Sequence, residues 1–115
     1  QPSYNSVVKE THHTQKLDSP SGTAISIADQ VVNSLDRYKC WKESDFVEDD
    51  TLQIIAQRKE NVPGTHEVMY KSDIDEISII HEAKNRKGFA MGAVIAAEFL
   101  VNKKGVFTMN DVLKF

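Results

Sequence analysis

Two segments of the chain carry apolar residues at the spacing of a single helix face. Residues three, four and seven positions apart share a face of an α-helix, so both segments are predicted helices. Ser19 or Ser21 is placed to cap the first helix, and residues 103–105 (Lys-Lys-Gly) are placed to end the second, with glycine as a left-handed cap. A short terminal helix is expected over residues 107–115, capped by Thr108. The apolar positions are Ala24, Ile27, Ala28, Val31, Val32 and Leu35 in the first helix, and Phe89, Ala93, Ala96, Ala97, Leu100 and Val101 after Gly88 in the second.

Shorter apolar stretches rich in β-branched residues predict about four strands. They begin with Val7 and Val8 and continue over residues 51–59, 65–70 and 74–83. Residues 62–64 (Val-Pro-Gly) have the chemistry of a turn between two of these strands. Residues 36–50 lose the apolar period, which predicts a surface connection anchored by aromatic side chains, namely Tyr38, Trp41 and Phe46. The expected fold is an α+β domain in which two main helices pack on an open mixed β-sheet.

The length of 115 residues fits one domain, spanning residues 1–115. Hydrophobic residues make up 40% of the chain, charged residues 27%, and the net charge is -3, which is typical of a soluble globular protein. This mild negative charge argues against a nucleic-acid partner. An anionic ligand would therefore need a local basic site.

The cysteine content and the absence of long apolar runs bear on the compartment. Cys40 is the only cysteine, so the chain forms no internal disulfide and a reducing cytoplasm is expected. The chain has no secretory leader and no apolar run near the roughly 18–20 residues that span a bilayer, so no membrane association is expected. Because it starts at Gln1 and not at methionine, we expect a piece excised from a longer polypeptide.

The densest chemistry lies between Glu10 and Ala24, in the stretch ETHHTQKLDSPSGTA. His12 and His13 can exchange protons near neutral pH, and Lys16 adds a fixed positive charge. Residues 21–23 (Ser-Gly-Thr) offer hydroxyl and backbone N–H groups at the start of the first predicted helix, where the helix dipole favours an anion. The stretch therefore predicts a site that holds a carboxylate and protonates a carbon next to it.

Structural alternatives remain open for these residues. Neighbouring positions on a strand point to opposite faces, so His12 and His13 are a poor metal pair, and one of them exposed with the other hydrogen-bonded in the core is the competing interpretation. His66 and His81 are expected to be core or edge residues of strands. Ser21 and Cys40 lack the setting of a nucleophile. Several cations are expected to be solvated unless the strand ends converge on the site, namely Arg58, Lys84, Arg86 and Lys87.

ETHHTQKLDSPSGTA closely resembles the signature of the dihydrodipicolinate reductase family, the 4-hydroxy-tetrahydrodipicolinate reductases of lysine and diaminopimelate biosynthesis. Three further segments extend the resemblance over nearly the whole chain. They are RKENVPGTHEV at residues 58–68, HEAKNRKGFAMGA at residues 81–93 and GVFTMNDVL at residues 105–113. One departure is Glu60, where the family pattern has glycine, so the turn before Val62 is expected to differ in shape.

The resemblance implies the C-terminal substrate-binding and tetramerisation domain of such a reductase, which follows a Rossmann domain that binds NADH or NADPH. The chain has no GxGxxG fingerprint of its own. The resemblance also implies a homotetramer joined through the sheet, reduction of a cyclic dicarboxylate to tetrahydrodipicolinate, and His12 as the general acid assisted by Lys16. The implied carboxylate-binding residues are His13, Lys16, Ser21, Gly22 and Thr23. The alternative is a non-catalytic oligomerisation or anionic-ligand-binding module.

Overall fold

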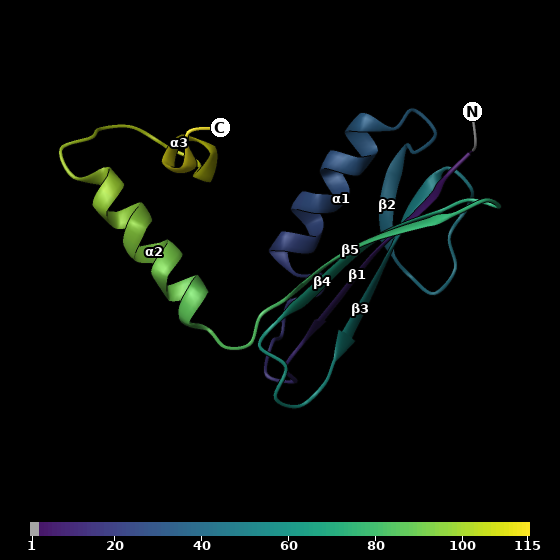
Figure 1. Ribbon diagram of the computed structural model, residues 1–115, viewed down its shortest axis with the longest axis horizontal. Helices are drawn as coiled ribbons and strands as arrows, with labels where there is room; N and C mark the ends of the chain where they lie inside the picture. Colours follow the sequence, from purple (N-terminus) through teal and green to yellow (C-terminus); the bar gives the residue numbers. More distant parts are fainter. Residues whose placement is uncertain (1–2) are drawn as a thin grey trace. The chain divides into compact units, whose positions relative to one another are not determined.

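The computed structural model describes residues 3–115, which form two compact units (Figure 1). The first unit ends at Glu82 and contains the β-sheet and one helix. The second unit starts at Ala83 and contains two helices. The stretch with the densest chemistry lies wholly within the first unit.

The first unit is built on an open, five-stranded mixed sheet in the order β2-β3-β1-β4-β5. Its central strand, β1, runs parallel to β3 and antiparallel to β4. β2 is parallel to β3 at one edge, and β5 is antiparallel to β4 at the other. The α+β fold with a mixed sheet is therefore confirmed. The strands are β1 (Asn5–His12), β2 (Cys40–Glu43), β3 (Thr51–Arg58), β4 (Thr65–Lys71) and β5 (Glu76–Glu82).

The sheet has one strand more than the sequence predicted, because β2 lies in the segment interpreted as a surface connection. Its four residues, Cys-Trp-Lys-Glu, show no alternation of apolar and polar side chains. The strand forms by pairing in register with β3, from Cys40 opposite Thr51 to Glu43 opposite Ile54. Backbone pairing with a neighbour that the local sequence does not reveal thus decides the conformation of this edge strand.

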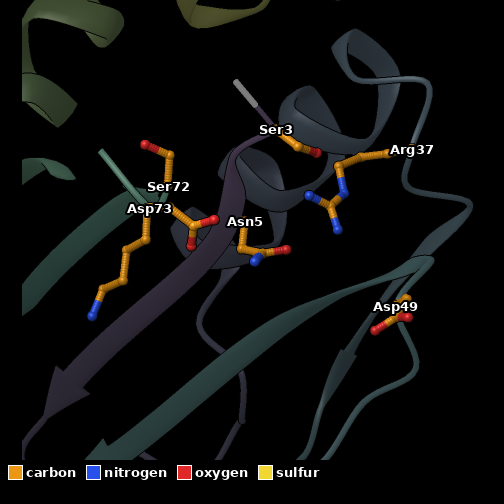
Figure 2. Close-up of a pocket in the computed structure, with 7 residues that line it drawn as sticks. Ser3, Asn5, Arg37, Asp49, Ser72 and Asp73 are labelled. Atoms are coloured by element: carbon orange, nitrogen blue, oxygen red, sulfur yellow. The ribbon is translucent and has the colours of Figure 1, made fainter. Parts of the chain in front are cut away.

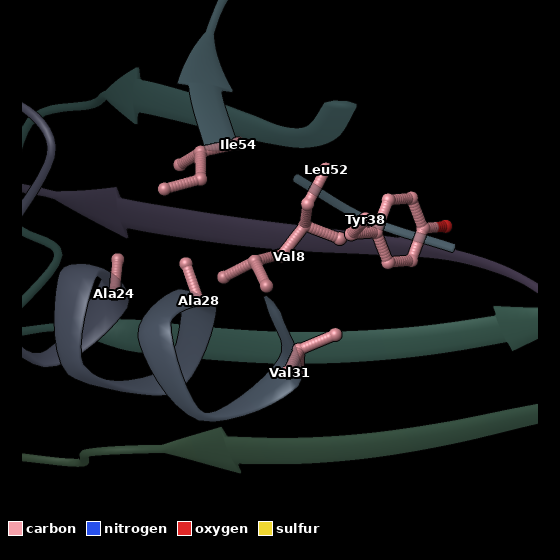
Figure 3. Packing of buried hydrophobic residues seen from close by; sticks show 7 residues of the cluster. All are labelled: Val8, Ala24, Ala28, Val31, Tyr38, Leu52 and Ile54. Carbon is pink, nitrogen blue, oxygen red and sulfur yellow. The ribbon is translucent and has the colours of Figure 1, made fainter. Parts of the chain in front are cut away.

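Helix α1 (Gly22–Ser34) contacts β1, β2 and β3 and closes the core of the first unit. Its buried residues fall on the face predicted from the apolar spacing, with Ile27, Val32 and Leu35 packed beside them. Small side chains at Ala24 and Ala28 let the helix approach Val8 at the centre of the sheet (Figure 3). The buried hydrophobic core is Val8, Ala24, Ala28, Val31, Tyr38, Leu52 and Ile54.

Two of the three aromatic residues expected to anchor the connection do so. Tyr38 is buried, and its hydroxyl accepts a hydrogen bond of 2.7 Å from the backbone N–H of Ser6. Trp41 packs against the core, and its indole N–H donates to Asp29 at 2.8 Å. Phe46 is 90% exposed, so its expected role as an anchor is wrong for this chain. It follows β2, an edge strand of the sheet.

The second unit consists of α2 (Lys87–Leu100) and the short α3 (Met109–Leu113). Helix α2 ends before the predicted Lys-Lys-Gly segment, and the first residue with positive φ after it is Asn102, at 62°. Gly105, the predicted cap, also has a positive φ, of 125°. Asparagine is the residue other than glycine that most often takes this position. Helix α3 has the predicted Thr108 cap, completed by the side chain of Asp111. None of the helices among residues 3–115 is long and apolar enough to cross a membrane.

Candidate active site

The site begins with the alternation of side chains along β1. Ser6, Val8, Glu10 and His12 are buried, while the residues between them are partly exposed. Because alternate residues of a strand share a face, the strand that places Val8 in the core also directs Glu10 and His12 toward the α1 side. Glu10 is completely buried, and the side chain of His12 is 11% exposed. A carboxylate and an imidazole thus lie side by side at the C-terminal end of the central strand.

Glu10 is the centre of this group of side chains. One of its carboxylate oxygens pairs with Nδ1 of His12. The Nη1 atom of Arg58 donates to both oxygens, at 2.9 and 3.1 Å. The backbone N–H of Ser21, at the start of α1, donates to Oε1 at 3.3 Å. A buried carboxylate is costly unless it is paired and hydrogen-bonded, and these partners meet that requirement.

Arg58 also holds the loop that follows β1. Its Nε donates to the backbone carbonyl of Lys16 at 3.3 Å, and its Nη2 donates to the carbonyl of Asp18 at 2.7 Å. The ammonium group of Lys16 lies 3.0 Å from the carboxylate of Asp18, and this contact lowers the pKa of Asp18. Of the two alternatives left open for Arg58, a solvated charge or a residue at converging strand ends, the structure supports the second. Strands β1 and β3 are parallel neighbours, and His12 pairs with Arg58 in their register.

Ser21 is the cap of α1, one of the two caps predicted. Its hydroxyl oxygen accepts a hydrogen bond of 3.1 Å from the backbone N–H of Ala24 and lies 3.0 Å from Nε2 of His66. Its own N–H is donated to Glu10. Ser21 is buried, whereas Gly22 and Thr23 are exposed in the first turn of the helix. The groups at this helix start that face outward therefore belong to Gly22 and Thr23.

His66 lies on β4 and completes the buried cluster. Its ring meets the ring of His12 edge-on, with centroids 5.1 Å apart. Burial, followed by the charge of His12, lowers the pKa of His66, so it is largely neutral at pH 7. The interpretation of His66 as a hydrogen-bonded core residue is confirmed, but this core position is inside the candidate site. His81, which pairs with His66 across the strands, is exposed.

The predicted site residues are thus brought together in part. His12 and Ser21 meet through Glu10, and the backbone of Lys16 is joined to the same carboxylate through Arg58. His13 is half-buried directly after β1, and the side chain of Lys16 is 23% exposed. Sequence reasoning missed the roles of three residues. They are Glu10, Arg58 and His66.

Two further features were possible parts of this site, a metal-binding cluster and a surface cavity, and neither belongs to it. Within residues 3–115, no cluster of three or more His, Cys, Asp or Glu side chains is placed to hold a metal ion. A shallow polar cavity of about 560 Å³ lies at the other end of β1 (Figure 2). There Arg37 donates a hydrogen bond to the backbone carbonyl of Tyr4. The residues that line it are Ser3, Asn5, Arg37, Asp49, Lys71, Ser72 and Asp73.

Comparison with known proteins decides the family. Residues 1–113 match the family described as "Dihydrodipicolinate reductase, C-terminus". The chain belongs to the dihydrodipicolinate reductase family. It is 54% identical over 110 residues to a 4-hydroxy-tetrahydrodipicolinate reductase of Christiangramia forsetii, with 96% of this chain and 46% of the relative covered. It is 37% identical over 113 residues to one of Methanosarcina acetivorans, with 96% and 43% covered.

The chain therefore spans less than half the length of these reductases. Among solved structures it resembles a dipicolinate-bound dihydrodipicolinate reductase from Paenisporosarcina sp. TG-14, with a TM-score of 0.64. The match covers 90% of this chain and 42% of that chain, at 21% identity. At this identity the likeness shows a shared fold, in agreement with the resemblance found from the sequence.

Proposed function

We propose that the chain is the substrate-binding and assembly domain of a cytoplasmic 4-hydroxy-tetrahydrodipicolinate reductase, which uses NADH or NADPH to form tetrahydrodipicolinate for lysine and diaminopimelate biosynthesis. Membership of the dihydrodipicolinate reductase family supports this function. The observation that carries it is the Glu10–His12 pair, buried beside the start of α1. The dipicolinate bound to the structural neighbour supports a small cyclic dicarboxylate as the ligand.

In this proposal His12 is the general acid. Its Nδ1 is paired with Glu10, so Nε2 is the ring nitrogen available to transfer a proton. The carboxylate fixes the orientation of the ring and balances the charge of the imidazolium, as an acidic partner does for other catalytic histidines. Reduction of an unsaturated ring builds negative charge on one carbon, and a positioned acid discharges it by proton transfer.

Binding of the substrate carboxylates is assigned to residues around His12. Lys16 and His13 supply positive charge or hydrogen-bond donors, and Lys16 also assists the proton transfer. Gly22 and Thr23 offer exposed groups at the positive end of α1. Ser21 supports the structure of the site, since its hydroxyl and N–H are hydrogen-bonded to Ala24 and Glu10. Fixed donors of this kind orient a dianion for reaction.

The residues of this chain do not fit a dinucleotide. The β1–α1 connection, residues 13–21, contains no glycine, whereas dinucleotide folds need a glycine-rich turn there to bring the backbone close to the pyrophosphate. Binding of the reductant is therefore assigned to residues outside this chain. The proposed homotetramer is supported by the apolar edge strand β5, which is a natural pairing surface. Its exposed large hydrophobic residues are Ile77, Ile79 and Ile80.

Calorimetric titration of the chain with pyridine-2,6-dicarboxylate tests the site. We expect binding, weakened about 10-fold or more in Lys16→Ala, because a charge-assisted hydrogen bond to the ligand is lost. His13→Ala should weaken it as well. Lys39→Ala is the matched control, since Lys39 also pairs with an aspartate, at 3.4 Å from Asp50, but its side chain is 80% exposed. Absence of binding, or equal losses in Lys16→Ala and Lys39→Ala, would contradict a substrate site here.

A further inference from the structure

The guanidinium of Arg58 joins two parts of the proposed site, the Glu10–His12 pair and the loop that carries Lys16, at residues 16–18. Among the described contacts, no hydrogen bond links these two parts directly. On one side it binds the Glu10 carboxylate, which holds His12. On the other side it binds the backbone carbonyls of Lys16 and Asp18. Its Nη1 also donates to the carbonyl of Gln57, at 2.8 Å, which fixes the group against β3.

We propose that Arg58 is a positioning residue: it fixes the place of the loop that carries Lys16 relative to His12, so that the proposed acid and the proposed carboxylate ligand act on one substrate. This inference rests on the proposed function of His12 and Lys16. Arg58 itself need not touch the substrate. It acts through Glu10 on one side and through the backbone of the loop on the other.

The planar fork of arginine is what this position requires. Nε, Nη1 and Nη2 each donate to a different partner, and the donors have a fixed geometry relative to one another. A lysine in the same place would supply a single ammonium group. That group could neutralise Glu10, but it could not also reach the carbonyls of both Lys16 and Asp18 in the same geometry. Arg58→Lys therefore separates the charge of Arg58 from its role as a bridge.

A purely electrostatic role is the competing explanation, and it predicts a different result. The carboxylate of Glu10 is fully buried and needs a cation, so Arg58 could be present for charge alone. In that case lysine would restore every property of the site. If Arg58 is a bridge, lysine preserves the folded chain but releases the loop.

The experiment compares the chain with its Arg58→Lys and Arg37→Lys variants. Arg37 is the matched control, because its guanidinium also binds a backbone carbonyl, that of Tyr4, but at the far end of β1. For Arg58→Lys we expect binding of pyridine-2,6-dicarboxylate to weaken by about 10-fold, the cost of one misplaced charge-assisted contact. Amide hydrogen exchange at residues 16–18 should become faster, while exchange in β3 and α1 is unchanged. Arg37→Lys should alter neither property.

Two outcomes would overturn the proposal. If Arg58→Lys binds the ligand as the unchanged chain does, lysine rescues the site and Arg58 supplies only charge. If exchange at residues 16–18 is unaffected, Arg58 does not hold the loop. The proposed function fails separately, when the unchanged chain binds no ligand. The exchange measurement needs no ligand, so it tests the bridge even in that case.

Discussion

Arg58 and Glu10 lie 48 residues apart in the sequence, yet Nη1 of the arginine donates to both carboxylate oxygens, at 2.9 and 3.1 Å. Glu10 is completely buried, while the side chain of Arg58 is 21% exposed. A pair of this kind is costly to break from one side, because the remaining charge keeps its loss of hydration. Removal of either partner is therefore expected to destabilise the fold as well as to disturb the geometry of the site.

Glu10→Gln removes the negative charge and keeps the shape of the side chain. We expect the free energy of unfolding to fall by about 3 kcal/mol, the lower end for a broken buried pair, because Arg58 retains its carbonyl acceptors. Urea unfolding followed by circular dichroism measures the loss. Glu48→Gln is the control, since Glu48 is exposed and a surface substitution changes stability by about 0.5 kcal/mol or less. Similar midpoints for the two variants would contradict the role given to Glu10.

Ser21→Ala removes the cap of α1 and the oxygen next to His66. We expect a loss of about 1–2 kcal/mol, because a capping hydroxyl contributes about 1 kcal/mol and His66 also loses a buried partner. Ser19→Ala is a close control, since Ser19 is exposed and its hydroxyl donates to the exposed Glu43 at 2.6 Å. Thermal unfolding should separate the two variants. Equal melting temperatures would show that the hydroxyl of Ser21 does not stabilise the helix.

The lowered pKa of His66 predicts a dependence of stability on pH. In the folded chain the pKa of His66 lies below its usual 6.5, so the unfolded state takes up this proton first as the pH falls. The contribution of His66 to stability is therefore fully present above pH 6.5 and is lost as the pH falls through the folded pKa. His66→Gln, which keeps a polar group near Ser21, should lose less stability than the unchanged chain over that range.

The control for this measurement is His81→Gln, because His81 is the exposed partner of His66 in the strand register. Chemical unfolding at a series of pH values between 8 and 5 gives both profiles. Burial is the largest cause of the lowered pKa of His66 and the charge of His81 is a smaller one, so we expect His81→Gln to change the profile less than His66→Gln does. An unchanged pH profile in His66→Gln would show that burial of His66 has no effect on proton binding.

His12→Asn, made in this chain joined to the remainder of the proposed reductase, tests the proposed general acid. The asparagine amide lies near the position of Nδ1 and can still donate to Glu10, but it supplies no acid. We expect kcat to fall about 10²- to 10⁴-fold, with a much smaller change in KM. His13→Ala should instead mainly raise KM. Steady-state kinetics distinguishes the two patterns, and an unchanged kcat in His12→Asn would remove His12 from the role of proton donor.

The sequence predicts those elements of the fold that have a strong local signal. The apolar spacing after Ser21 locates α1 because one face of that helix meets the core, and Thr108 locates α3 because capping is decided within one turn. The strand β2 escapes prediction because its conformation depends on β3, whose pairing no local pattern reveals. Likewise, α2 ends earlier than predicted, because the chain takes a positive φ at Asn102, three residues before Gly105, which offered the more familiar signal.

The candidate site, like the fold, is predictable only where the signal lies within one short segment. His12 and Ser21 stand out because they lie in one short stretch with a helix start. Glu10 had a usable signal, since it shares the face of Val8 and His12 in an alternating strand, where a buried carboxylate implies a cation nearby. Arg58 and His66 had no comparable signal within their own segments. They reach the site only through the register of β3 and β4 with β1.

The central position of β1 has a consequence for how the chain acquires its site. Val7 pairs with Gln53 on one side and with Met69 on the other, so β1 must wait until both of its neighbours have been synthesised. Pairings so distant in sequence raise the contact order, which slows folding. The two rings of His12 and His66 can meet only after residue 66 has left the ribosome. Synthesis must pass the middle of this chain before the proposed acid has its full surroundings.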